Sequence, residues 1–458
     1  MTDGVPTGVT VSPDVKAFLG RTPEPEFVEA FITDINGIAR GKRLPAASLP
    51  RLYGKGLCLP ASTLVLDVWG EEVAETGLIF ETGDADHTCY PVPGSLRPLP
   101  WSERPGGQLL LQMLTPEGGP FPGDPRNILA GVVARLGELG VTPVVATELE
   151  FRLFDAEPGP DGRPRPPSMA TRGGSRSQLF GLDELESLDG LFADIEKACE
   201  AQGLPADTLI AEQSEGQYEI NLTHVADPLL AADQAVLLKR TIKACARRHG
   251  LVASFMAKPF GDQSGNGMHV HVSLVDGDQR NVFAGDEAMS TVLRHAVGGL
   301  LATMEETTAI CAPHANSFRR FQPGSHVPMA PTWGVDNRTT ALRLPLAEPS
   351  ASRIEHRVAG ADANPYLVVA NVLAGIHYGI TGSVEPPPQT RGSAYEQVAA
   401  SLPDEWGEAI AAFERSPFVA DYLGETYRRW FAACKRQERE RLRRDVPASE
   451  YDAYLGTI

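Results

Sequence analysis

The chain has 458 residues and a formal net charge of −18, with 59 acidic against 41 basic residues. A protein that binds nucleic acid or an anionic membrane surface needs a basic face, so this charge argues against both partners. The sequence contains no apolar run approaching the ~18 residues of a membrane-spanning helix, and its N-terminus lacks the basic and apolar regions of a signal peptide. The six cysteines include no CxxC pair, which is typical of reduced thiols, so we expect a cytoplasmic protein.

The N-terminal part of the chain predicts a leader followed by a small β-rich domain. Residues 1–24 are rich in Gly, Pro and Thr, and we expect them to be flexible. Predicted strands follow at 26–35 and 58–68, and a strand within 99–114 closes the domain. We therefore place the first domain at 25–117.

The rest of the chain, 118–458, alternates predicted helices with predicted strands, which indicates a second domain of the α+β class. Its helices begin at Asp-Pro or Asn-Pro pairs, because Asp or Asn caps a helix and proline suits its first turn. The expected elements are helices over 124–140, 227–250 and from 364, a strand over 141–151, a long flexible loop over 155–178, and charged helices from about 404 that form a solvated or inter-subunit face.

Four short segments carry the residues of a candidate site. The segment KPFGDQSGNGMHVHVS (258–273) predicts a Gly-rich loop and then a strand with two histidines on one face, because side chains alternate along a strand. TELEF, EQSEGQYEINL and RIEHR contribute acidic residues in the same way. Clustered carboxylates with an imidazole suit a hard cation such as Mg²⁺ or Mn²⁺, and the nearby arginines suit polyphosphate. Any one of these residues alone has a simpler interpretation, a surface salt bridge or a solvated histidine.

Taken in order, these segments resemble the glutamine synthetase family. The pattern runs from ExE through E-x(3)-GQxE, KP-x(5)-GxGMHxH, NSFRRFQPG, NRTTALRLP and RIEHR to DANPYL, and it covers roughly residues 26–458. The resemblance implies a β-grasp N-terminal domain and a catalytic domain built on a curved antiparallel sheet surrounded by helices. It also implies that ATP converts the γ-carboxylate of glutamate into an acyl phosphate, which then reacts with an amine.

The resemblance also implies roles for individual residues. It assigns two or more Mg²⁺ or Mn²⁺ ions to Glu150, Glu212 and Glu219 and to Glu148, His269 and Glu355. It assigns ATP contacts to His271, Ser273, Arg338, Arg343 and Arg353, with Arg338 and Arg343 also neutralising the transferred phosphoryl group. It assigns glutamate binding to Ser264, Gly265, Arg320 and Arg357.

The sequence departs from the family at the positions that handle ammonium. His326, in the flap segment PGSHVP (323–328), replaces a glutamate that takes a proton from ammonium, and Pro60 or Ala61 stands where an aspartate helps to bind it. Ser264 replaces an asparagine, and Ile210-Ala211 stands where a histidine commonly lies before the first acid of the motif that begins at Glu212. Similar changes occur in the family members that glutamylate polyamines and other amines, so His326 is our candidate proton acceptor.

We therefore expect an ATP-dependent ligase that joins glutamate to a polyamine or a monoamine. The alternatives are a true glutamine synthetase with an altered flap, or a weakly active homologue that regulates nitrogen metabolism. The resemblance also implies a homo-dodecamer of two hexameric rings in which residues 58–68 complete a neighbour's pocket. Tyr395 lies near the family's adenylylation site, but its flanks differ, and we do not expect that modification.

Overall fold

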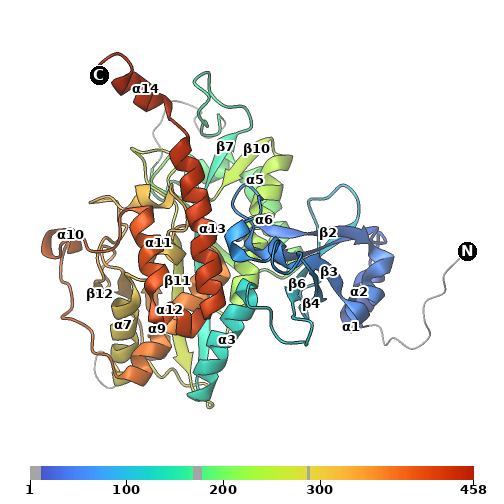
Figure 1. Ribbon diagram of the computed structural model, residues 1–458, viewed down its shortest axis with the longest axis horizontal. Coiled ribbons are helices and arrows are strands. Elements are labelled where there is room, and N and C mark those ends of the chain that lie inside the picture. Colours follow the sequence, from blue (N-terminus) through green and yellow to red (C-terminus); the bar gives the residue numbers. More distant parts are fainter. Residues whose placement is uncertain (1–11, 169–177, 286–288) are drawn as a thin grey trace, which may run out of the picture.

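The computed structural model describes residues 12–168, 178–285 and 289–458. Figure 1 shows two β-sheets: a small one formed by the N-terminal part of the chain, and a large one that is accompanied by most of the helices. This mixture of mainly antiparallel sheets and packed helices confirms the α+β class.

The N-terminal sheet has the strand order β2-β1-β6-β4-β3, with β5 paired to β6. Strand β1 pairs antiparallel with β2 and parallel with β6, and its buried apolar residues form part of the core. The strands are β1 (Phe27–Thr33), β2 (Ala39–Pro45), β3 (Leu57–Pro60), β4 (Asp86–Pro91), β5 (Arg97–Pro98) and β6 (Gly106–Met113), accompanied by α2 (Leu49–Lys55).

Two N-terminal expectations were wrong. Helix α1 (Pro13–Leu19) lies within the expected leader, and its Val15 and Phe18 are buried, so this part is packed against the core. Residues 1–11 lie outside the described residues. The strand expected over 58–68 ends at Pro60 and continues as a 3₁₀ helix (Ala61–Val65). The Asp84 carboxylate accepts hydrogen bonds from the backbone N–H and the hydroxyl of Ser62, which fixes the chain in a turn instead of a strand.

The large sheet has the strand order β12-β13-β14-β11-β7-β9-β8, with β10 paired to β7. All of its pairs are antiparallel except β12–β13, which is parallel. The strands are β7 (Thr142–Asp155), β8 (Ala206–Ala211), β9 (Gln217–Leu222), β10 (Leu251–Ser254), β11 (Met268–Val275), β12 (Trp333–Val335), β13 (Leu342–Leu344) and β14 (Ile354–His356).

Side chains alternate along β7 as the sequence predicts. Val145, Thr147 and Leu149 are buried against the core, whereas Glu148 and Glu150 are partly exposed on the other face. Of the loop expected over 155–178, residues 169–177 lie outside the described residues.

Helices pack against the apolar face of this sheet. Helix α6 contacts β7 and β10, and the almost wholly buried α9 contacts β11. The capped starts are confirmed, because Asp124, Asp227 and Asn364 each accept hydrogen bonds from the first-turn N–H groups of α3, α6 and α9. The helices are α3 (Pro125–Glu138), α4 (Leu182–Ser187), α5 (Asp189–Gln202), α6 (Pro228–Arg248), α7 (Thr291–Thr303), α8 (Thr308–Cys311), α9 (Pro365–Gly382), α10 (Ala394–Gln397), α11 (Trp406–Arg415), α12 (Pro417–Leu423), α13 (Glu425–Arg444) and α14 (Ala448–Tyr454).

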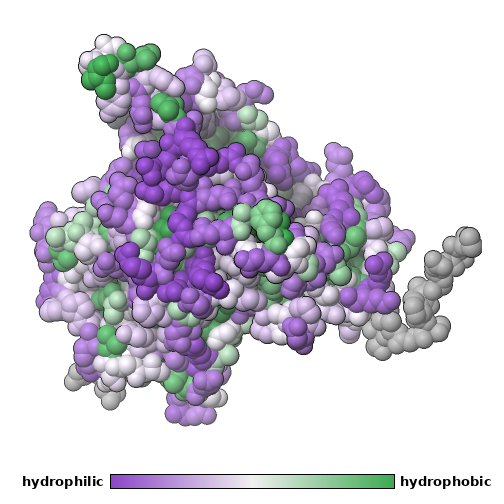
Figure 2. Space-filling model, viewed as in Figure 1, coloured by the Kyte–Doolittle hydropathy of each residue, from purple (hydrophilic) through white to green (hydrophobic). Residues whose placement is uncertain are grey.

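The charged C-terminal helix α13 is partly buried, so only its exposed positions could form the solvated or inter-subunit face that we expected. Its Lys435 and Glu438 form a buried ion pair of 2.9 Å, and both side chains also bond to Asn36 of the N-terminal part. Figure 2 shows a mostly hydrophilic outer face over α13 and hydrophobic residues gathered on the protruding α14. The large side chains that are well exposed here are Tyr451 and Tyr454 of α14 and, after it, Leu455 and Ile458.

In the described parts of the chain, no helix is long and apolar enough to cross a membrane. All six cysteines are free thiols, five of them buried.

Candidate active site

Strand register gathers the candidate residues on the polar face of the large sheet. His269 on β11 lies opposite Glu148 on β7. His271 lies opposite Glu355 on β14, which in turn lies opposite Arg343 on β13. Residues paired across strands lie close enough for their side chains to meet, so four strands present one continuous polar row.

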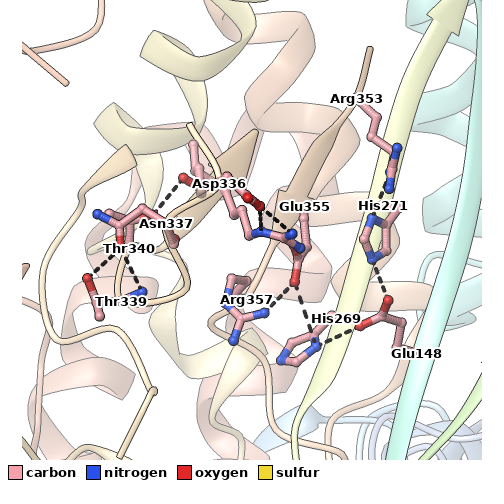
Figure 3. A network of polar contacts seen from close by, with 12 residues as sticks. Glu148, His269, His271, Asp336, Asn337, Thr339, Thr340, Arg353, Glu355 and Arg357 are labelled. Carbon is pink, nitrogen blue, oxygen red and sulfur yellow. Dashed lines mark hydrogen bonds and ion pairs between the residues drawn. The ribbon is translucent and has the colours of Figure 1, made fainter. Parts of the chain in front are cut away.

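Glu148 is held between the two histidines, as Figure 3 shows. Its Oε2 lies 3.0 Å from His269 Nδ1 and its Oε1 lies 2.8 Å from His271 Nε2. Burial by itself raises the pKa of Glu148, but the hydrogen bonds with His269 and His271 outweigh it and hold the pKa far below its ordinary value. Glu148 is therefore a permanent negative charge at the centre of the site.

Glu355 is held between two arginines. Its Oε2 accepts a hydrogen bond of 2.7 Å from Arg343 Nη1, and its Oε1 accepts one from Arg357 Nη1. Burial by itself raises the pKa of Glu355. The electrostatic effect of Arg357, and then that of His269, outweighs burial and brings the pKa down to about 2. Arg343 also contacts Asp336 at 2.6 Å, so its guanidinium is fixed from two sides.

Glu150 is oriented by backbone and by a residue that the sequence analysis missed. Its Oε2 accepts hydrogen bonds from Gly267 N–H at 2.9 Å and from Gln217 Nε2 at 3.1 Å. Gln217 Nε2 also donates to the Gly265 carbonyl at 2.9 Å, so this buried amide ties the Gly-rich loop to the carboxylate. The place of Gln217 between acids in the GQxE motif was the available sequence signal.

Glu212 and Glu219 complete an acidic cluster around Glu150. Glu219 lies directly opposite Glu150 in the β7–β9 register. Burial, and then the negative charge of Glu150, raise the pKa of Glu212 to about 7 and that of Glu219 far above its ordinary value. The charge of Arg338 opposes this shift at Glu212, which places the exposed Arg338 near the cluster. Carboxylates that repel one another in this way favour a bound cation.

Two sets of donor atoms in the described residues could hold a metal ion. One comprises Glu148, Glu219 and His269, the other Glu148, His271 and Glu355, and the donor atoms of each set lie within 4.8 Å of one another. Carboxylate oxygens with one imidazole suit Mg²⁺ or Mn²⁺. The grouping differs from our expectation, because His271, expected at the nucleotide, lies with the metal donors and Glu148 belongs to both sets.

A pocket of about 430 Å³ opens beside this row. His271, Ser273 and Arg353, three of the residues expected to contact ATP, line it together with Glu148. Arg353 Nε donates to His271 Nδ1 at 3.3 Å. Larger hollows lie elsewhere, along residues 400–415 and beside α13, and the candidate site residues do not line them.

The Gly-rich loop is packed closely against two buried arginines. A side chain at Gly265 would lie 2.6 Å from the Ala257 carbonyl and 2.8 Å from Arg320 Cγ, so only glycine fits. Arg320 donates to the Val358 carbonyl at 3.1 Å. Arg152 on β7, which the sequence analysis missed, donates to the Ser264 carbonyl at 2.8 Å and so connects the loop to the sheet.

The remaining candidates lie apart from the strands. His326 is exposed in the flap and has a left-handed backbone, with φ 58°. Ala61 is buried, and its N–H donates to the Ala85 carbonyl in the N-terminal part at 3.3 Å.

Comparison with known proteins agrees with this geometry. The family described as "Glutamine synthetase, catalytic domain" matches residues 122–454. Gamma-glutamylputrescine synthetase PuuA of Escherichia coli is 39% identical over 98% of this chain and 95% of its own length. Gamma-glutamylethanolamide synthetase GlnA4 of Streptomyces coelicolor is 34% identical over 76% of this chain and 74% of its own length.

A solved structure of a GmaS/ADP complex superposes with a TM-score of 0.83 at 30% identity, covering 94% of this chain and 97% of that one. The predicted resemblance is confirmed: the chain belongs to the glutamine synthetase family.

Proposed function

We propose that this protein is an ATP-dependent ligase that joins the γ-carboxylate of glutamate to an organic amine, giving a γ-glutamyl amide, ADP and phosphate. One observation carries the choice of acceptor: the strands keep the full set of acidic, histidine and arginine residues, whereas the tip of the flap presents His326 in place of an acid. The names of the relatives PuuA and GlnA4 support an amine acceptor.

The chemistry needs an activated carboxylate, because a free carboxylate is a poor electrophile. ATP transfers its terminal phosphoryl group to a γ-carboxylate oxygen of glutamate, and the amine nitrogen then attacks the acyl carbon while phosphate leaves. In our proposal the amine's proton passes to His326, because an imidazole nitrogen can accept a proton in general base catalysis.

The residues of the sheet bind and orient the reactants. Glu148, Glu150, Glu212, Glu219, His269 and Glu355 would hold two or more divalent metal ions, with His271 beside them. When bound, Mg²⁺ or Mn²⁺ would supply positive charge that offsets the phosphate charges. Arg338 and Arg343 stabilise the negative charge of the transferred phosphoryl group, and Arg353 and Ser273 contact the nucleotide.

Glutamate is bound by the Gly-rich loop and by two arginines. Ser264 and Gly265 approach it through the loop, and Arg320 and Arg357 pair with its carboxylates. Both arginines are less than a tenth exposed and each has a buried Nε atom without a hydrogen-bond partner, which agrees with donors reserved for an anionic substrate.

The competing functions differ in their products. A true glutamine synthetase would use ammonium, although His326 is a poorer site for a small cation than a carboxylate. A weakly active regulatory homologue would not need the intact donor sets around Glu148 and Glu150. The decisive experiment measures ADP release with glutamate, Mg²⁺ and a panel of polyamines, monoamines and ammonium. ADP release with an amine supports the ligase, release with ammonium alone supports glutamine synthetase, and no release supports the regulatory homologue.

The organisation of the chain completes the proposal. We assign residues 25–117 to a β-grasp domain and 118–458 to the catalytic domain, in a cytoplasmic protein. We further propose a dodecamer of two hexameric rings, in which 58–68 completes a neighbour's pocket. The exposed apolar residues at the C-terminal end of the chain, in and after α14 (Figure 2), provide surface for such contacts. Light scattering tests this assembly, and a fully active monomer would contradict a shared site.

A further inference from the structure

A segment between α9 and α11 lies along the chain that follows the flap. We call residues 387–402 the strap. The Tyr395 hydroxyl donates to the Val327 carbonyl at 2.9 Å. The N–H groups of Ser401 and Leu402 donate to the Met329 carbonyl at 2.9 and 3.0 Å. The strap therefore holds two carbonyls, those of Val327 and Met329, which lie one and three residues after His326.

The strap also holds the loop that carries Arg338. Asn337 Nδ2 donates to the Gly392 carbonyl at 2.8 Å, and Ala394 N–H donates to the Thr339 hydroxyl at 3.0 Å. Asn337 and Thr339 flank Arg338 in the sequence, and Figure 3 labels both of them together with Asp336. The strap thus contacts both the segment that follows the flap tip and the loop that carries Arg338.

The tip of the flap needs such support. His326 adopts a φ of 58°, which residues other than glycine rarely adopt and which persists only when neighbouring contacts fix it. On one side of the tip, the single hydrogen of the Ser325 hydroxyl is within donating distance of two carbonyls, that of Gln322 at 2.6 Å and that of Arg320 at 3.1 Å. On the other side, Val327 is buried and its carbonyl is held by Tyr395.

The Tyr395 hydroxyl is suited to this role. Burial raises its pKa above the ordinary value, while its hydrogen bond with Ser325 and the nearby charge of Arg357 oppose part of that shift. The hydroxyl therefore stays protonated, and remains a donor, throughout the neutral range. The influence of Arg357 also places Tyr395 close to the glutamate-binding residues.

We infer that Tyr395 is a positioning residue that fixes His326 through the Val327 carbonyl, and that its hydroxyl determines how well the flap excludes water from the acyl phosphate. This inference rests on the proposed ligase function. When the flap is loose, water attacks the acyl carbon in place of the amine, the bond to the phosphate oxygen breaks, and glutamate and phosphate are released. ATP is then consumed without amide formation.

The test compares Tyr395→Phe with Tyr422→Phe, which removes a tyrosine hydroxyl that bonds to His377 Nδ1 at 2.7 Å, between α12 and α9. Phosphate and amide are measured together in the purified full-length enzyme. We expect the phosphate-to-amide ratio to rise about three-fold or more in Tyr395→Phe, as the loss of one hydrogen bond predicts. The KM for ATP should stay within about two-fold, and Tyr422→Phe should match the parent in both quantities.

A second measurement does not depend on activity. Hydrogen exchange of residues 323–329 should be faster in Tyr395→Phe than in the parent and in Tyr422→Phe. Ser325→Ala, which loosens the opposite side of the tip, should raise both exchange and the phosphate-to-amide ratio, and it carries the test if Tyr395→Phe does not fold.

An unchanged phosphate-to-amide ratio in folded Tyr395→Phe overturns the inference, as does unchanged exchange of the flap. If the parent forms only glutamine from ammonium, the proposed amine specificity fails. The role of Tyr395 is then tested separately, by hydrogen exchange of residues 323–329 and by the phosphate-to-glutamine ratio, both of which should rise in Tyr395→Phe.

Discussion

The strands under the site and the flap beside it are built in opposite ways. On β7, β11 and β14, the residues Glu148, His269 and Glu355 are fixed by strand register and by mutual hydrogen bonds. The flap tip is exposed, has a left-handed residue, and is fixed by single contacts from Ser325 and Tyr395.

This contrast separates two tasks of the proposed enzyme. Activation of glutamate needs many charges at fixed positions, which a sheet provides because its register cannot shift without moving every side chain to the other face. The choice of acceptor needs only one or two residues beside the acyl carbon, and a loop can change them without disturbing the sheet. The acceptor can therefore differ between relatives while the strands stay the same.

The largest effect should come from Glu148→Gln, which keeps the size of the side chain but removes the charge shared by both donor sets. We expect kcat to fall by about 100-fold or more for every acceptor. Loss of a residue that only hydrogen-bonds to a metal ligand already costs up to about 100-fold in activity, and loss of the ligand itself should cost at least as much. The measurement is ADP release at saturating Mg²⁺. The exposed Glu200→Gln on α5 is the matched control. Parental activity of Glu148→Gln would show that the site is wrongly assigned.

Substitutions at His326 should change the acceptor and leave the activation of glutamate intact. His326→Ala should slow amide formation about 100-fold by removing a proton acceptor. His326→Glu should raise the ratio of ammonium use to amine use about 10-fold or more, because a carboxylate attracts ammonium. Competition assays with both acceptors measure this ratio. The exposed His249→Ala is the control, and equal ratios in all variants would show that the flap residue is incidental.

Gly267→Ala should harm the site more than the fold. The added carbon would lie 3.1 Å from His269 Nε2, 3.2 Å from Arg320 Nη2 and 3.3 Å from Glu150 Oε1. We expect kcat/KM for glutamate to fall about 10-fold, since small displacements of reacting groups are costly. Gly131→Ala, in open space on α3, should instead raise the free energy of unfolding by about 0.5–1 kcal/mol. Thermal unfolding and steady-state kinetics are measured for both variants. If kcat/KM for glutamate is unchanged in Gly267→Ala, Gly267 does not border the site.

A smaller effect should appear when metal binds. The pKa of Glu212 is raised from 4.5 to about 7, and a metal ion requires the ionised form. Mn²⁺ binding at about pH 6, where most Glu212 side chains are still protonated, should therefore release about one proton from Glu212. Calorimetry in buffers of different ionisation enthalpy measures this release.

The same shift gives the metal-free protein a stability contribution that is full below pH 4.5 and is lost as the pH rises through about 7. Glu212→Gln should reduce both effects. Mn²⁺ binding without proton release would contradict the acidic cluster as its site.

Much of the strand-built part could be predicted from the sequence. Alternation along TELEF and MHVHVS placed Glu148 with Glu150 and His269 with His271 on one face, and Asp124, Asp227 and Asn364 marked the starts of helices. These features depend on residues near in sequence, so local patterns contain them.

Features that depend on distant segments could not be predicted. The sequence did not show that His271 shares Glu148 with His269, or that Gln217 connects Glu150 to Gly265, because these contacts depend on pairing between strands far apart in the chain. The turn at Ala61 depends on Asp84, and the hold on the flap depends on Tyr395. Local propensity favoured a strand at Ala61, and it contained no information on the contact between Tyr395 and the flap.

The most direct test of the proposed acceptor compares kcat/KM for ammonium with that for putrescine, longer polyamines and ethanolamine in the parent enzyme. An organic amine gains about 0.8 kcal/mol for each buried CH₂ group, whereas ammonium meets no flap carboxylate at His326. We predict that at least one amine exceeds ammonium by about 100-fold or more. Glutamine formation from ammonium that is as fast as the reaction with every amine would contradict the proposal.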